Sequence, residues 1–127
     1  MKKTMVAVNI LTDVDNSIYL SHCQMWYRMG KNFPDDKFYL YTPHRTTIDN
    51  CRNFAAKMAL EQECDYLYFV DDDMILHEMT YQSLRENIER PGVDVVMALT
   101  YIRGYPFHPM FFIDPHRSAY EVKELDF

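Results

Sequence analysis

The stretch Tyr66-Leu67-Tyr68-Phe69-Val70-Asp71-Asp72-Asp73 decides the fold that we expect for this chain. Five apolar or aromatic residues are typical of a buried β-strand, and the strand stops abruptly at three aspartates. Neighbouring carboxylates repel one another, so water or a cation must offset that repulsion when they lie in a cleft. Mg²⁺ and Mn²⁺ suit this purpose, because they prefer oxygen ligands and commonly use one or two carboxylates plus substrate phosphates. A solvated acidic turn is the alternative interpretation.

Other segments of the chain also have the composition of strands. Residues 5–11 are almost continuously apolar, which predicts a central strand covered on both faces. Residues 37–41 predict a second strand that ends at Thr42-Pro43, because proline cannot donate to a sheet ladder. Residues 93–99 predict a fourth buried strand, and residues 110–113 are a candidate fifth.

Helical periodicity separates these strands in three places. The first stripe ends near Gly30 and consists of Tyr19, Leu20, Cys23, Trp26 and Tyr27. The second begins at a cap residue, Thr46 or Thr47, and consists of Ile48, Cys51, Ala55, Met58 and Ala59. The third runs from near Thr80 to Pro91-Gly92, with Tyr81, Leu84 and Ile88 inward and the pairs Arg85/Glu89 and Glu86/Arg90 facing water.

Strands that alternate with helices predict right-handed βαβ crossovers. We therefore expect an α/β fold in which a mainly parallel open sheet carries helices on both faces. A length of 127 residues and a hydrophobic content of 48% suit a single domain, residues 1–127, built around one core.

Charge and cysteine content exclude several classes of function. A formal net charge of -6 argues against a nucleic-acid-binding surface, which needs clustered Lys and Arg. The three cysteines have no CxxC spacing, which favours buried thiols in a reducing compartment and hence a cytoplasmic protein. No apolar stretch approaches the roughly 18 residues that predict a membrane span, and no secretory signal is expected.

Ligands of open parallel sheets bind beyond the carboxyl ends of the strands, where neighbouring loops converge. This rule selects the residues that follow each expected strand: Thr12 and Asp13, Thr42 to Arg45, Asp71 to Asp73, and Thr100 to Arg103. We expect the site to be formed by these four loops.

A polar triplet on the second helix is a further candidate. Asp49, Arg52 and Asn53 occupy i, i+3 and i+4, so their side chains are neighbours on one helical face. Together with Arg45 and an acidic strand end nearby, they could bind a base, a ribose or a phosphate. The alternative is an exposed ion pair that contributes a few tenths of a kcal/mol.

The segments 51–60 and 65–74, Cys-Arg-Asn-Phe-Ala-Ala-Lys-Met-Ala-Leu and Asp-Tyr-Leu-Tyr-Phe-Val-Asp-Asp-Asp-Met, resemble the core of GT-A glycosyltransferases, especially the family 2-like group. In that group an Arg-Asn helix precedes a hydrophobic strand that ends in a DxD motif. We judge the likeness to cover residues 4 to about 114.

The resemblance implies a nucleotide-sugar-binding domain that uses Mn²⁺ or Mg²⁺. Asp73 would help to hold the metal that bridges the donor diphosphate, and Asp71 would assist it while facing the ribose or sugar, with Asp72 beside them. Thr12 and Asp13 would lie near the base. Arg52 and Asn53 would lie close to the nucleotide pocket. UDP- and GDP-sugars are the usual donors of the family, and the acceptor is unknown.

The sequence also departs from the family pattern. GT-A enzymes usually continue into an acceptor-binding half that supplies the catalytic base of inverting members, whereas this chain stops at Phe127. A late metal-binding histidine has two candidates, His108 and His116, for which structural roles are favoured. No catalytic base can be assigned. A natural minimal enzyme, a fragment, and a domain that binds donor without transferring sugar are all compatible with this pattern. A partner chain or a homo-oligomer is compatible with it as well.

Two other functions remain open at this stage. A non-catalytic nucleotide-binding or assembly module would keep the fold without transferring sugar. A phosphatase of the haloacid dehalogenase type also places DxD at a strand end, but Met74-Ile75 stands where that family expects Gly-Thr. The acidic run also follows the third expected strand, which further disfavours the phosphatase.

Overall fold

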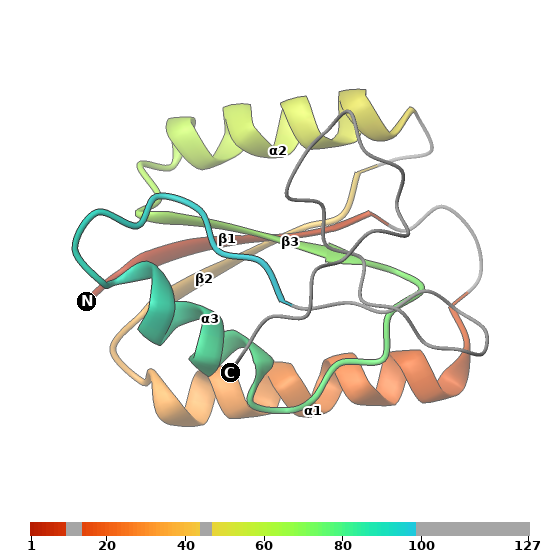
Figure 1. Cartoon of the computed structure of the whole chain (residues 1–127). Helices are drawn as coiled ribbons and strands as arrows, with labels where there is room; N and C mark the ends of the chain where they lie inside the picture. The colour runs from red at the N-terminus through yellow and green to blue at the C-terminus, as the bar shows by residue number, and fades with distance from the viewer. Residues whose placement is uncertain (10–13, 44–46, 99–127) are drawn as a thin grey trace, which may run out of the picture. The chain divides into compact units, whose positions relative to one another are not determined.

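The computed structural model describes residues 1–9, 14–43 and 47–98 (Figure 1). The chain divides into two compact units, the first from Met1 to Arg85 and the second beginning at Glu86. Most of the second unit lies outside the described residues, so the expectation of a single domain stays a prediction. The candidate fifth strand at residues 110–113 lies outside them as well.

Three parallel strands form the sheet of the first unit. They are β1 (Lys3–Asn9), β2 (Lys37–Tyr41) and β3 (Tyr66–Asp71), in the order β2-β1-β3. The central position of β1 explains its apolar sequence, since residues 4–8 are all buried. β1 pairs in parallel with β2 and with β3 along its length. The predicted parallel α/β fold is therefore confirmed, as is the predicted position of each of these strands within the described residues.

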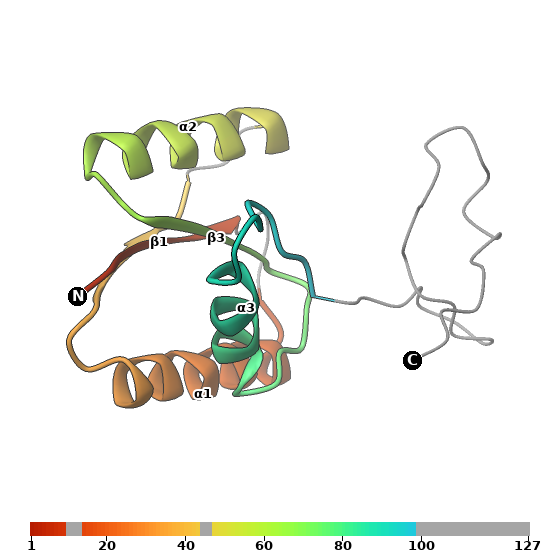
Figure 2. The same cartoon turned by 60° about the vertical axis from the view of Figure 1, so that its left-hand side comes forward.

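Helices cover both faces of this sheet (Figure 2). α2 (Ile48–Glu61) lies on one face, whereas α1 (Asn16–Asn32) and α3 (Thr80–Ile88) lie on the other. α2 presents small buried side chains, Cys51, Ala55 and Ala59, to the sheet. Small side chains allow the helix axis to approach the strands closely, as the predicted stripe implies. Ile48 at the start of that stripe is nevertheless 47% exposed.

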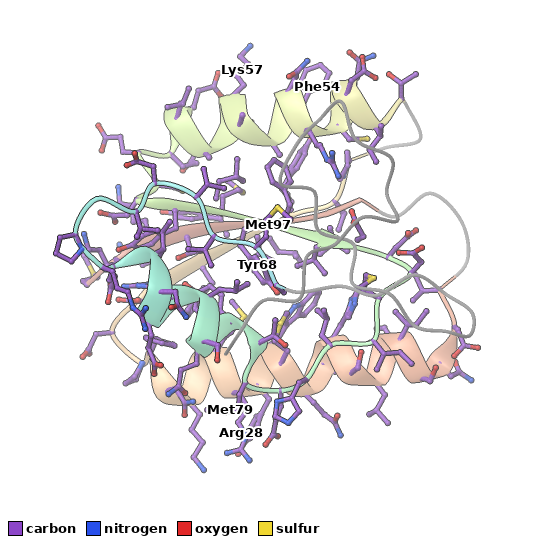
Figure 3. All side chains as sticks on the ribbon, in the orientation of Figure 1. Arg28, Phe54, Lys57, Tyr68, Met79 and Met97 are labelled. Carbon is purple, nitrogen blue, oxygen red and sulfur yellow. The ribbon has the colours of Figure 1, made fainter. Side chains whose placement is uncertain are left out.

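The main hydrophobic core lies between the sheet and α1. It consists of Val6, Val8, Met25, Met29, Val70 and Tyr81, with Trp26, Phe33, Phe38, Tyr68 and Leu76 packed around it. Figure 3 shows Tyr68 between the sheet and α1, where its hydroxyl donates to the sulfur of Met25 at 3.4 Å. Burial raises the pKa of Tyr68 to about 12, because the phenolate would lose its hydration.

The face that α1 buries differs from the predicted stripe. Tyr19, Leu20 and Tyr27 are 63%, 58% and 68% exposed, and the helix continues past Gly30 to Asn32. The buried residues are Ser21, His22, Met25 and Met29. The prediction is therefore wrong for these three exposed residues, whereas Trp26 packs against the core and Cys23 is half-buried. Ser21 and His22 face inward because they form hydrogen bonds with the segment that follows β3.

Arg85 was expected to face water and is instead 6% exposed. Its Nη1 atom lies 3.1 Å from the Asp36 carboxylate and 3.2 Å from the Tyr81 hydroxyl. The guanidinium also lies 4.3 Å from the centroid of the Tyr66 ring. A buried arginine is tolerated when its charge is paired and its donors are used, and Asp36 and Tyr81 meet that condition here.

The fourth strand predicted at residues 93–99 is wrong over its described part. Residues 93–98 adopt no strand, and Val95 and Met97 are 79% and 70% exposed. An apolar, β-branched composition suits a pleated, half-buried surface but does not create a strand without neighbours to pair with. Gly92, with φ of 79°, adopts a left-handed conformation that favours glycine, and it ends the turn before this segment.

Candidate functional site

The connections of the sheet reverse direction between β1 and β3. From β1 the chain crosses through α1 to β2 on one side, and from β2 it crosses through α2 to β3 on the other side of β1. The two crossing helices therefore cover opposite faces (Figure 2). Asn9 and Asp71 are register partners at the carboxyl ends of the two strands. Open α/β sheets bind their ligands at such a reversal, beyond the carboxyl ends of the strands.

The acidic run lies at the carboxyl edge of the sheet, beside this reversal. Asp71 is the last residue of β3, and Asp72 and Asp73 form the turn that follows it. The side chains of Asp71 and Asp73 are exposed, and that of Asp72 is half-buried. Strand end and turn together place several carboxylates within reach of a ligand in solution.

Arg52 of α2 faces this acidic strand end. Its Nη2 atom lies 3.8 Å from Oδ1 of Asp71, and both side chains are about half exposed, at 50% and 51%. The guanidinium also lies 5.9 Å from the centroid of the Phe69 ring. Side chains alternate along a strand, so Phe69 and Asp71 point to the same face of β3, the one that α2 covers. The structure thus brings a predicted helix residue and a predicted strand-end residue together.

The other members of the polar triplet remain at the start of α2. Asp49 and Asn53 are both exposed. A hydrogen bond from the Thr47 side chain, assisted by backbone N–H groups at the helix start, lowers the pKa of Asp49. Asp49 therefore complements the amino end of the helix, while Arg52 extends to β3 for its ion pair. Thr47 occupies the predicted cap position.

Sequence reasoning missed the contacts that hold the segment after the acidic turn. The His22 Nε2 atom lies 3.0 Å from the carbonyl oxygen of Met74, and the Ser21 hydroxyl accepts a hydrogen bond from the Leu76 N–H at 3.1 Å. Arg28 donates twice to the carboxylate of Glu78, both times at 2.9 Å. The sequence held one indication of this buried face, since His22, Met25 and Met29 also recur at helical spacing. Polar residues such as His are less often buried, so the spacing alone did not select this face.

Several predicted site residues lie outside the described residues. They are Thr12, Asp13, Arg45, the segment Thr100–Arg103, and the two candidate histidines His108 and His116. Their roles therefore stay predictions. Among the described residues, no group of three His, Cys, Asp or Glu side chains is arranged to hold a metal ion. No helix in the described part of the chain is long and apolar enough to cross a membrane.

Comparison with known proteins identifies the family. Neither the curated proteins nor the solved structures give a match. The family model described as Glycosyl transferase family 2 matches residues 15–123, which is most of the chain. The match begins after β1 and includes α1, β2, α2, β3, the acidic turn and α3. The chain therefore belongs to glycosyl transferase family 2.

Proposed function

We propose that this protein is a metal-dependent glycosyltransferase that binds a UDP- or GDP-sugar and transfers the sugar to an acceptor of unknown identity. Membership of glycosyl transferase family 2 supports glycosyl transfer and suggests a nucleotide-sugar donor. The observation that carries the finer proposal is the acidic turn, Asp71 to Asp73, at the point where the sheet reverses direction. Arg52, on the adjoining helix, supplies a positive charge beside it.

The donor set at this turn fits Mn²⁺ or Mg²⁺. Carboxylate oxygens are the ligands that these hard cations prefer, and the exposed side chains of Asp71 and Asp73 can turn toward an ion. Ions of this kind are usually held by one or two carboxylates, with phosphates and water as the remaining ligands. We therefore assign the metal to Asp71 and Asp73 together with the donor diphosphate.

The bound metal would neutralise the charge that develops on the leaving nucleoside diphosphate. The chain's own residues bind and orient the donor. Arg52 is proposed to interact with the nucleotide, because it can exchange its half-exposed ion pair with Asp71 for a ligand without large cost. Asp49, Asn53 and Asp72 are proposed to line the same pocket, along with Thr12, Asp13 and Arg45.

Release of nucleoside diphosphate from UDP- and GDP-sugars in the presence of Mn²⁺ tests the proposed activity. We expect wild-type protein to release it and Asp73→Ala to lose at least about 100-fold in rate, the order of magnitude for removing one electrostatic stabiliser. Asp35→Ala is the matched control, because this exposed aspartate precedes β2 at the opposite edge of the sheet.

The outcomes separate the candidate functions. Equal rates in wild type and Asp73→Ala would contradict the assignment of the turn. Donor binding without any release, over a panel of acceptors, would contradict the enzymatic proposal and favour a non-catalytic nucleotide-binding module.

A further inference from the structure

The segment that follows the acidic turn is fastened to α1 at successive points. Figure 1 shows the chain descending from the end of β3 to α1 before it enters α3. Met74, Leu76 and Glu78 of this segment each contact α1, and each contact bridges at least 50 residues of sequence. Alternate residues of the segment are thus fixed to a single helix, which gives the segment one defined path.

His22 makes the contact nearest to the acidic turn. Its side chain is buried at 5% exposure, and its Nε2 atom lies 3.0 Å from the carbonyl oxygen of Met74. A carbonyl oxygen only accepts hydrogen bonds, so Nε2 carries the proton and donates it. Met74 directly follows Asp73, which makes the Met74 carbonyl the first fixed backbone group after the turn.

The two ends of the turn are therefore held separately. Pairing of Asp71 with Asn9 fixes the backbone at the end of β3, and His22 fixes it again at Met74. Only Asp72 and Asp73 lie between these points. Two residues of backbone between two anchors have few conformations available, so the backbone positions from which the carboxylates extend are restricted before any ligand binds.

The contacts farther along protect this arrangement. The Ser21 hydroxyl donates to the carbonyl of Ile18 at 2.8 Å, which leaves its oxygen available to accept from the Leu76 N–H. The two hydrogen bonds between Arg28 and Glu78 use the planar fork of the guanidinium, a geometry that restrains both side chains. The segment is thus prevented from drawing the Met74 carbonyl away from His22.

We propose that His22 is a positioning residue of the transferase, which acts through the Met74 carbonyl to preorganise Asp71 and Asp73 for the metal and the donor diphosphate. The inference rests on the proposed function of the acidic turn. A histidine that merely fills the core would affect stability alone. If His22 positions the turn, a replacement that keeps the hydrogen bond to Met74 should preserve donor affinity, and a replacement that loses the bond should weaken it.

Calorimetric titration of UDP and GDP in the presence of Mn²⁺ distinguishes these roles, with the unfolding midpoint measured for each variant. Met at position 22 keeps a long side chain without a donor, and Gln places an N–H near the position of Nε2. We expect His22→Met to raise the Kd about 10-fold, a typical effect of losing a residue that orients metal ligands, and His22→Gln to stay within about threefold of wild type. Asn32→Ala is the control, since Asn32 joins α1 to Gln82 of α3 rather than to the segment after the turn.

Hydrogen exchange of the backbone amides in the segment 72–78 provides a readout that needs no ligand. We expect faster exchange in His22→Met and unchanged exchange in His22→Gln. If His22→Met does not fold, Ser21→Ala takes its place, with an expected rise in Kd of about threefold and faster exchange at Leu76.

Each result bears on the inference. Unchanged Kd in His22→Met, or in Ser21→Ala where it replaces that variant, would overturn the inference and leave the proposed function intact. An equal loss of affinity in the Met and Gln variants would also overturn it, because the hydrogen bond would then be irrelevant. Absence of Mn²⁺-dependent binding in the wild type would overturn the proposed function and this inference together.

Discussion

Arg52 and Asp71 form an ion pair that contributes little to stability and can be exchanged for contacts with a ligand. Both side chains are about half exposed and the charged atoms are 3.8 Å apart. Exposed pairs of this kind contribute roughly 0–1 kcal/mol to folding. This pair matters for its position, because it joins α2 to the end of β3, where the sheet reverses direction.

Replacing Arg52 with Ala should therefore separate binding from stability. We expect the free energy of unfolding to change by less than about 1 kcal/mol, and the affinity for UDP or GDP to fall about 10-fold through loss of a charge-assisted contact. Calorimetry and urea unfolding measure the two quantities. Lys57→Ala is the control, since Lys57 lies on α2, is 68% exposed and pairs with Glu61 (Figure 3). A larger effect on stability than on binding would contradict this role for Arg52.

Glu78 makes part of the stability depend on pH. The hydrogen bonds from Arg28 lower the pKa of Glu78 below its ordinary value of 4.5, and the positive charge of Arg28 lowers it further. A carboxylate whose native pKa is depressed stabilises the fold above its unfolded pKa, and that contribution is lost as the pH falls through the native value.

Comparison of wild type with Glu78→Gln should reveal this dependence. The difference in unfolding free energy is expected to be constant between about pH 7 and pH 5 and to shrink below about pH 4. Chemical denaturation at a series of pH values measures it. A difference that stayed constant down to about pH 3 would show that the ion pair with Arg28 does not form in solution.

The interior of the first unit contains an ion pair that the predicted order of helices and strands did not reveal. Arg85 of α3 and Asp36, which precedes β2, form an ion pair in which the side chains are only 6% and 10% exposed. Asp36 also accepts a hydrogen bond from the backbone N–H of Lys2 at 2.7 Å. The pair thus connects α3 with the starts of β1 and β2.

Removing the carboxylate from this pair should be costly. We expect Asp36→Ala to lower the free energy of unfolding by about 3 kcal/mol, because a buried guanidinium would lose its counter-charge. The neighbouring exposed Asp35→Ala should change it by no more than about 0.5 kcal/mol. Urea unfolding of both variants provides the comparison, and equal small effects would refute the burial of this pair.

Local sequence patterns predicted most elements of the sheet. They failed where contacts with residues far away in the sequence determine which side chains are buried. β1, β2, β3 and α2 lie where predicted, because apolar composition marks the strands and helical periodicity marks the helix. The face of α1 could not be predicted, since Ser21 and His22 are buried only because a segment about 50 residues away folds back onto them. Residues 93–98 show the converse, an apolar run without a strand.

The candidate site was predictable to the extent that it depends on strand ends. The rule for parallel sheets selected Asp71 to Asp73, and helical spacing selected Arg52, which the structure places beside Asp71. The hydrogen bond between His22 and the Met74 carbonyl could not be predicted from residue spacing, because Met74 lies in an irregular segment. Thr12, Asp13 and Arg45 lie outside the described residues and stay predictions.

The arrangement of the whole first unit leads to one central claim, that the acidic turn at the reversal of the sheet holds a metal and a nucleoside diphosphate. The reversal of the chain and the acidic run at the end of β3 coincide at this location, and family membership supports glycosyl transfer. The claim depends on Asp73 more directly than on any other residue, because it lies in the turn and its side chain is exposed.

The most direct test is calorimetric titration of UDP and GDP into wild type and Asp73→Ala, each with and without Mn²⁺. We predict that the wild type binds one of the two nucleotides only when Mn²⁺ is present, and that Asp73→Ala loses this binding while keeping the wild-type unfolding midpoint. Binding that is equal in the two proteins, or the absence of binding in the wild type under every condition, would contradict the claim.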